Sequence, residues 1–164
     1  MRKILVLWVA WGVAGSAWAA PLRVVSLNVE LGLGGPASTG FSLVARDLER
    51  IGADVVALQE LQSDFQNIQA LGSRLGLPYF YATNSNSMNA GVLSRYPLRS
   101  QEWINTGWGP AIPLVRPDVP GVEDDPWIAV VHLKCCGSAG GTEQQTRAAE
   151  LYNLRSALLA RGIG

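Results

Sequence analysis

The chain has 164 residues, of which 48% are hydrophobic and 16% are charged, and 13 Lys and Arg residues balance 13 Asp and Glu residues. This length suits one domain with a buried core. No long polar tract, heptad pattern or internal repeat occurs, which excludes disordered, coiled-coil and repeat architectures. Lysine and arginine form no cluster, so charge gives no support for nucleic-acid binding. Eighteen glycines and nine prolines favour short strands and turns over a helix bundle.

The first 19 residues have the pattern of a secretory signal peptide. Arg2 and Lys3 give a positive start, an apolar stretch follows, and residues 16–19 form a small-x-small cleavage pattern. The alternative is an uncleaved membrane anchor, but the apolar stretch is short for a bilayer span and two glycines interrupt it. We therefore expect cleavage near Ala19, a secreted or periplasmic protein, and one domain over residues 20–164.

Strand-like runs alternate with helical patterns in the first half of the chain. The predicted strands cover residues 22–29, 54–58, 79–81 and 90–94, and the predicted helices cover 42–51 and 63–75. Ser42 is the expected N-cap of the first helix, and Gly52 and Gly76 are the expected stops. The strand at 54–58 does not alternate polar with apolar residues, which predicts burial on both faces.

The second half is less regular until its last helix. Strands are expected near Trp103 and Leu114, and a further non-alternating strand is expected at 127–131. Thr142 and Gln145 match a capping box, which predicts a helix that ends near residue 161. The buried side of this helix is expected to consist of Ala148, Leu151, Leu154, Leu158 and Leu159. Buried strands with helices between them predict a layered α/β or α+β domain.

Three apolar strands end in polar residues that a buried strand does not need. The first ends at Asn28, the second at Gln59 and Glu60, and the third at His132, the only histidine. An Asn oxygen and a Glu carboxylate are hard ligands that suit Mg²⁺ or Mn²⁺. An imidazole beside them can stabilise charge or transfer a proton. This combination of groups is suited to metal-dependent cleavage of phosphate esters.

Each of these residues also has an ordinary structural explanation. Asn28 can cap a strand end, Glu60 can face solvent, and a single histidine is more often structural than catalytic. The adjacent Cys135 and Cys136 would form a strained disulfide with each other. In an oxidising compartment we expect either that both stay free or that one pairs with a cysteine beyond Gly164.

Four blocks of the sequence, in their order, resemble the endonuclease/exonuclease/phosphatase superfamily. They are residues 23–28 (RVVSLN), 54–60 (DVVALQE), 89–97 (NAGVLSRYP) and 127–134 (WIAVVHLK). Together with the helix that follows them, the resemblance covers nearly all of residues 22–161. It implies an α+β fold, a four-layer α/β/β/α sandwich of two mixed β-sheets packed face to face, present here as its N-terminal portion.

The resemblance also implies roles for individual residues. Asn28 and Glu60 would bind a divalent cation, Mg²⁺ with Mn²⁺ or Ca²⁺ as alternatives, and would be catalytic together with His132. His132 would contact the scissile phosphate, and Gln59 would support Glu60 from the adjacent position. Asn89 would belong to a substrate-contacting loop. Val131 departs from the family, which usually has Thr or a similar residue before the histidine.

The implied function is hydrolysis of phosphodiester or phosphomonoester bonds by a metal-dependent phosphoesterase. The substrate would be DNA or RNA, a phospholipid such as sphingomyelin, or a sugar phosphate, with no stable protein partner and with membrane contact only through a lipid substrate. The family's later Gly-Asp-x-Asn and Ser-Asp-His blocks do not occur in this sequence, so the 164-residue chain is expected to be truncated at its C-terminus and inactive alone. The alternatives are a non-catalytic secreted binding module and a structural domain on the same fold.

Overall fold

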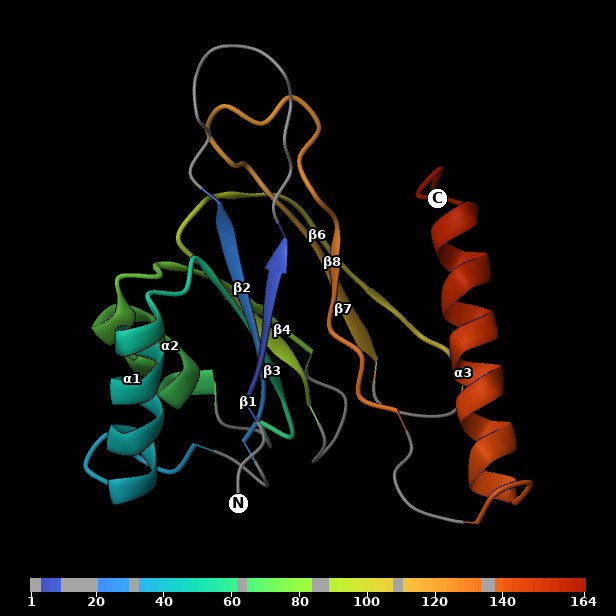
Figure 1. The fold of residues 1–164 in the computed structure, drawn as a ribbon, viewed down its shortest axis with the longest axis horizontal. Coiled ribbons are helices and arrows are strands. Elements are labelled where there is room, and N and C mark those ends of the chain that lie inside the picture. The colour runs from blue at the N-terminus through green and yellow to red at the C-terminus, as the bar shows by residue number, and fades with distance from the viewer. Residues whose placement is uncertain are drawn as a thin grey trace.

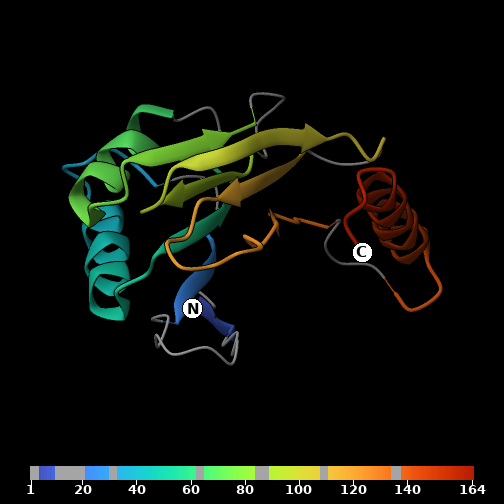
Figure 2. The same ribbon diagram turned by 90° about the horizontal axis from the view of Figure 1, so that it is seen from above.

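Two β-sheets lie face to face in the computed structural model of the chain, with helices on their outer sides (Figures 1 and 2). The structure describes residues 4–9, 21–29, 33–61, 65–83, 89–107, 111–133 and 138–164. Within these residues no helix is both long and apolar enough to span a bilayer.

Sheet A contains five strands in the order β1-β2-β3-β5-β4. They are β1 (Ile4–Val9), β2 (Leu22–Asn28), β3 (Val55–Gln59), β4 (Tyr79–Ala82) and β5 (Gly91–Ser94). Strands β2 and β3 are parallel and the other pairs are antiparallel, so the sheet is mixed. A parallel pair needs a crossover connection, which helix α1 (Thr39–Ile51) provides. The register places Asn28 beside Gln59 at the ends of the two strands.

Sheet B contains β6 (Leu98–Ile104), β7 (Ile112–Pro117) and β8 (Ile128–Ala129), all antiparallel. The strands expected near Trp103 and Leu114 are confirmed as β6 and β7. Two mixed sheets were predicted, but the described strands of sheet B are all antiparallel. In the described part of the chain only sheet A is mixed. The strand expected at 127–131 is shorter than predicted, and its residues are half-buried apart from Val130. Both faces of the strand are covered, since Ile128 and Val130 pack in the cluster between the sheets and Ala129 and Val131 pack in the cluster with α3, but the burial is only partial.

Three hydrophobic clusters define the four layers. The first joins alternate residues of β2 and β3 to α1 and α2 (Phe65–Leu75), and includes Val25, Leu27, Val56, Leu58, Phe41, Leu48, Ile68 and Leu71. The second lies between the sheets and includes Val55, Ala57, Val92, Val115 and Val130. The third joins sheet B to α3 (Thr142–Leu159) through Ile104, Ile112, Leu114 and Leu154. The α/β/β/α order of the predicted sandwich is thereby confirmed.

The starts of α1 and α3 differ from the predicted ones, whereas the predicted helix stops at Gly52 and Gly76 agree. Ser38, and not Ser42, is the N-cap of α1, and its hydroxyl accepts a hydrogen bond of 3.1 Å from the Phe41 N–H. Gly52 ends α1 with a left-handed φ of 65°, as expected. Helix α3 has Gly141 as its N-cap and no side-chain cap, so the capping box at Thr142 is wrong.

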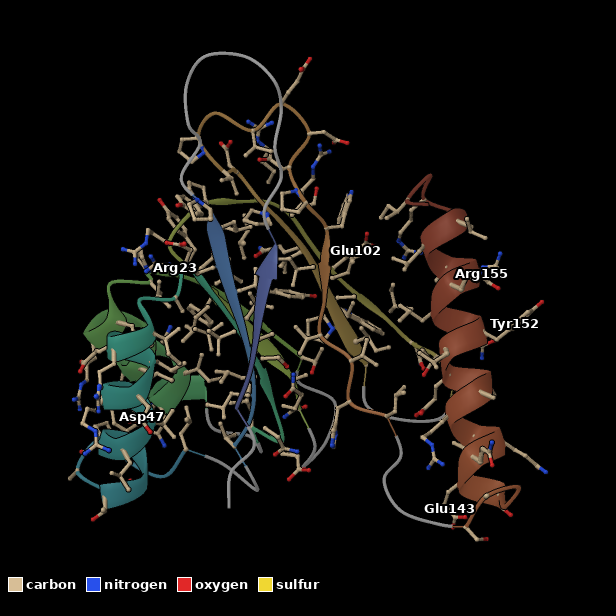
Figure 3. The ribbon with its side chains drawn as sticks, viewed as in Figure 1. Arg23, Asp47, Glu102, Glu143, Tyr152 and Arg155 are labelled. Carbon is tan, nitrogen blue, oxygen red and sulfur yellow. The ribbon has the colours of Figure 1, made fainter. Side chains whose placement is uncertain are left out.

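The buried side of α3 was predicted only in part. Leu154 is buried and Leu158 is half-buried, but Ala148 is exposed, as are Leu151 (48%) and Leu159 (55%). Tyr152 is 69% exposed and projects, like Arg155, away from the sheets (Figure 3). Apolar residues lie on more than one side of this helix, so their spacing could not select the side that packs on sheet B.

Residues 4–9, which have the sequence pattern of a signal peptide outside the fold, form β1 at the edge of the described sheet. This strand pairs with β2 from Ile4 opposite Leu27 to Val9 opposite Leu22. The pairing belongs to the uncleaved chain, and cleavage near Ala19 would remove it. The signal peptide therefore stays a prediction.

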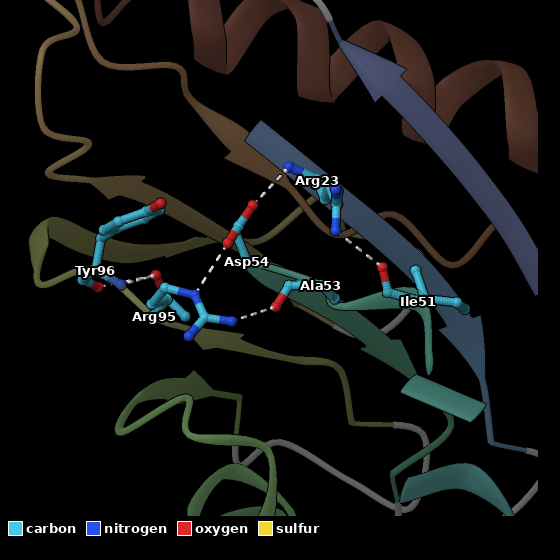
Figure 4. Close-up of polar contacts among 7 residues, drawn as sticks. Arg23, Ile51, Ala53, Asp54, Arg95 and Tyr96 are labelled. Carbon is cyan, nitrogen blue, oxygen red and sulfur yellow. Dashed lines mark hydrogen bonds and ion pairs between the residues drawn. The ribbon is translucent and has the colours of Figure 1, made fainter. Parts of the chain in front are cut away.

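The carboxylate of Asp54 holds together the end of sheet A at which β3 begins (Figure 4). Its Oδ2 accepts a hydrogen bond of 3.0 Å from the Arg23 backbone N–H, and its Oδ1 pairs with Arg95 Nε at 2.9 Å. Arg95 also donates to the Ala53 carbonyl. Burial, and secondarily Asp54, raises the pKa of Tyr96, which therefore stays neutral beside the network. One side chain thus joins β2, β3 and the end of β5.

At its other end, β3 stops at a residue with a left-handed backbone. Glu60 has a φ of 60° and is the one non-glycine residue with positive φ in the described ranges. The backbone is held on both sides, because the Gln59 carbonyl accepts from the Val29 N–H at 3.0 Å and the Leu61 N–H donates to the Asn89 carbonyl at 2.9 Å. A residue with a Cβ is disfavoured in this conformation, so the surrounding structure must maintain it.

Replacement of Asp54 by alanine should lower the free energy of unfolding by about 2 kcal/mol, because two charge-assisted hydrogen bonds are lost. Asp47→Ala is the control, since Asp47 forms an exposed ion pair with its neighbour Arg46. That control should change stability by less than about 0.5 kcal/mol. Urea unfolding followed by circular dichroism measures both values, and equal losses would contradict a special role for Asp54.

Glu60→Gly should be more stable than Glu60→Ala by about 1 kcal/mol, because glycine adopts positive φ without a Cβ clash. Both variants remove the carboxylate, so their difference reports the backbone alone. The same pair at Glu49, inside α1, should show the opposite order, since glycine is the weaker helix former. Thermal unfolding of the four variants decides this, and a more stable Glu60→Ala would refute backbone strain at this position.

Candidate functional site

Asn28, Glu60 and His132 come together at the C-terminal ends of β2 and β3, where the segment that follows β8 passes close to them. Asn28 Nδ2 donates a hydrogen bond of 2.8 Å to Glu60 Oε1, and His132 Nε2 lies 3.2 Å from the same oxygen. Asn28 and Glu60 come from sheet A, whereas His132 comes from the chain that leaves sheet B. The three residues singled out from separate strand ends therefore lie in direct contact.

The left-handed turn at Glu60 explains how its carboxylate reaches Asn28. Along β3, Val56 and Leu58 pack toward the helices, whereas Val55 and Ala57 pack toward sheet B. Strict alternation would direct the side chain of residue 60 toward the helices. The positive φ of Glu60 interrupts the alternation, and the carboxylate lies against Asn28 instead.

Gln59 is buried, with 7% of its surface exposed, and its side chain supports the pairing of β2 with β3. Its Nε2 donates a hydrogen bond of 3.0 Å to Ser26 Oγ, two residues before Asn28 on the same face of β2. Sequence reasoning missed Ser26. The available signal was a hydroxyl two residues before Asn28, inside the otherwise apolar run of residues 24–27.

Asn89 is joined by a main-chain hydrogen bond to the residue that follows Glu60. Its carbonyl accepts the Leu61 N–H, and the residue is 1% exposed. Its predicted role in substrate binding stays a prediction, as do the roles of the other site residues. The neighbouring Thr83, which is 3% exposed and was also missed by sequence reasoning, hydrogen-bonds the backbone of Ala90. Cys135 and Cys136 lie outside the described residues.

The site is partly shielded from solvent, since the side chains of Glu60 and His132 are each 17% exposed. Interactions between charges are stronger in such a position than on an open surface. The carboxylate accepts a hydrogen bond from Asn28, and its contact with His132 would be an ion pair if the imidazole carried a proton on both nitrogens. The Glu60 carboxylate can therefore hold a cation or a proton, with the Asn28 amide and the His132 imidazole beside it as hydrogen-bonding groups.

The donor set fits a hard divalent cation. Glu60 and Asn28 offer a carboxylate and an amide oxygen, and Mg²⁺ is usually held by one or two carboxylates with water and phosphate oxygens completing the shell. The described ranges contain no group of three or more His, Cys, Asp and Glu residues that could hold a metal. A closed zinc site with four protein ligands is therefore not formed by these residues.

Several solved structures share the fold. A humanized D. rerio TDP2 matches with a TM-score of 0.62 and 18% identity, over 82% of this chain and 55% of that chain. Sphingomyelinase C from Streptomyces griseocarneus matches with a TM-score of 0.62 and 21% identity, over 87% and 60%. TDP2 from C. elegans matches with a TM-score of 0.63 and 19% identity, over 84% and 43%. The chain thus spans roughly half the length of these proteins, and a comparison with curated proteins gives no match.

The family itself is identified by a match over most of the sequence. A model of the Endonuclease/Exonuclease/phosphatase family matches residues 25–163. The match includes Asn28, Glu60 and His132, and the observed layers agree with the sandwich that the resemblance implied. The chain belongs to the endonuclease/exonuclease/phosphatase family.

Proposed function

We propose that this chain carries the Asn28–Glu60–His132 part of the active site of a secreted, metal-dependent phosphoesterase. The observation that carries the proposal is the convergence of an amide and an imidazole on one carboxylate oxygen, at 2.8 and 3.2 Å. Family membership supports it, because the family consists of hydrolases that act on phosphate esters.

Each residue has a distinct part in the proposed reaction. Glu60 and Asn28 would hold the divalent cation, Mg²⁺ with Mn²⁺ or Ca²⁺ as alternatives. When bound, this cation would supply Lewis acidity for water activation and would neutralise phosphate charge. His132 would donate a hydrogen bond to a phosphate oxygen, or a proton to the leaving group, as negative charge develops. Gln59 and Ser26 would keep the ends of β2 and β3 in register beside these groups.

The proposed substrate is a phosphodiester or phosphomonoester. Among the structural neighbours, one is a sphingomyelinase and another is D. rerio TDP2 complexed with a single-strand DNA product, with a TM-score of 0.54 and 18% identity. The sequence has no cluster of Lys and Arg, which favours a phospholipid head group or a small phosphate ester over nucleic acid. Sphingomyelin, single-stranded DNA and a sugar phosphate, assayed side by side, would separate these classes.

Glu60→Gln and His132→Asn should each lower kcat/KM for bis(4-nitrophenyl) phosphate in the natural protein at least about 100-fold, because each removes a group that stabilises developing charge. Glu49→Gln is the matched control, since Glu49 pairs with Arg74 on the exposed surface of the two helices. EDTA should abolish activity and Mg²⁺ should restore it. Full activity in a folded Glu60→Gln variant would instead support the non-catalytic alternatives.

Secretion predicts a new N-terminus at Ala20 in the exported protein, because cleavage is expected after Ala19. Mass spectrometry of the N-terminal peptide from exported protein measures this directly. Removal of residues 1–19 would also remove β1 and make β2 the edge of the described sheet. An exported protein that retains residues 4–9 would contradict the signal peptide and would support β1 as part of the mature fold.

A further inference from the structure

The buried hydroxyl of Thr83, just after β4, forms hydrogen bonds with the backbone of Ala90, just before β5. The residue is 3% exposed, its Oγ1 donates to the Ala90 carbonyl at 3.2 Å, and the same oxygen accepts from the Ala90 N–H at 3.2 Å. Its backbone N–H also donates to the Ala90 carbonyl at 3.0 Å. Three hydrogen bonds thus fix one residue at the start of β5, and no part of the proposed reaction uses this hydroxyl directly.

A short series of contacts leads from Thr83 to Glu60. Ala90 follows Asn89, whose carbonyl accepts the Leu61 N–H at 2.9 Å, and Leu61 follows Glu60. This hydrogen bond holds the chain just after the left-handed residue, as the bond between the Val29 N–H and the Gln59 carbonyl holds it just before. Because a glutamate does not prefer positive φ, both flanking contacts are needed to maintain it.

We propose that Thr83 is a positioning residue for Glu60. Its hydroxyl fixes Ala90 and therefore Asn89, whose carbonyl anchors Leu61 and maintains the turn that directs the Glu60 carboxylate toward Asn28 and His132. The inference rests on the proposed function only in taking Glu60 as the functional carboxylate. Thr83 acts through the main chain and contacts none of the proposed reacting groups.

The other end of β5 offers a matched control. Ser94 is fully buried, its Oγ donates to the Tyr96 carbonyl at 2.8 Å, and the same oxygen accepts from the Tyr96 N–H at 3.0 Å. This hydroxyl also bonds both backbone groups of one residue, but it lies beside the Asp54 network and away from Glu60. If Thr83 had only a general structural role, loss of either hydroxyl would have similar effects throughout the sheet.

The test compares Thr83→Val, which keeps the shape but lacks the hydroxyl, with Thr83→Ser and Ser94→Ala. Native-state hydrogen exchange is measured by NMR at the Leu61 amide and at the Arg95 amide, which donates to the Asp54 carbonyl at 2.8 Å. Thr83→Val should accelerate exchange at Leu61 at least about tenfold and leave Arg95 unchanged. Ser94→Ala should do the reverse, and Thr83→Ser should resemble the wild type. Thr83→Ala provides a second hydroxyl deletion should the valine variant not fold.

Titration with Mg²⁺ alone gives an independent measure of the positioned carboxylate. Calorimetry should show at least about tenfold weaker Mg²⁺ binding in Thr83→Val, with wild-type affinity in Ser94→Ala and in Thr83→Ser. Unchanged exchange at Leu61, or equal acceleration at Leu61 and Arg95, would overturn the proposal. Failure of the wild type to bind Mg²⁺ would count against the proposed function, whereas the exchange pattern tests Thr83 by itself.

Discussion

The site depends on the parallel register of β2 and β3. Both strands are covered on one face by helices and on the other by sheet B, so a shift of one residue would exchange the two buried sets. Such a shift would turn Asn28 and Gln59 toward the helical core, where neither polar side chain has a partner among the apolar residues of that cluster. The packing of both faces therefore determines which polar side chains meet at the ends of these strands.

Glu60 shows where the needs of the fold and of the site conflict. A regular β3 would direct a carboxylate toward an apolar cluster, and burial of an unpaired charge is costly. A left-handed turn avoids that burial and brings the carboxylate to Asn28 and His132, at the cost of an unfavourable backbone conformation. The conformation persists because the main chain on both sides of Glu60 is hydrogen-bonded to neighbouring chain segments. A glutamate in this position supports a functional hypothesis, because an apolar residue would satisfy the fold without the left-handed conformation.

The sequence predicted best what depends on local pattern. Continuous burial of Val55 to Leu58 followed from the lack of alternation, and Gly52 was recognised as a helix stop because only glycine adopts its φ readily. The buried side of α3 could not be predicted, because the helix has apolar residues on more than one of its sides. Packing against sheet B determines which of them are buried. The contact of His132 with Glu60 depends on how the two sheets pack, which no local pattern encodes. Ser26 and Thr83 are ordinary polar residues in the sequence, and only their hydrogen bonds distinguish them.

The two ends of sheet A differ in how their charged groups are held. At one end Asp54 and Arg95 form an ion pair, and the Ser94 hydroxyl both donates to and accepts from the backbone of Tyr96. At the other end the carboxylate of Glu60 stays partly exposed, and its described partners are the uncharged Asn28 amide and the His132 imidazole. Because the first end joins β2, β3 and β5 firmly, the second can tolerate a left-handed glutamate without loss of strand register. Backbone strain at one end of a sheet is thus compatible with a stable sheet when the opposite end is held by charge-assisted hydrogen bonds.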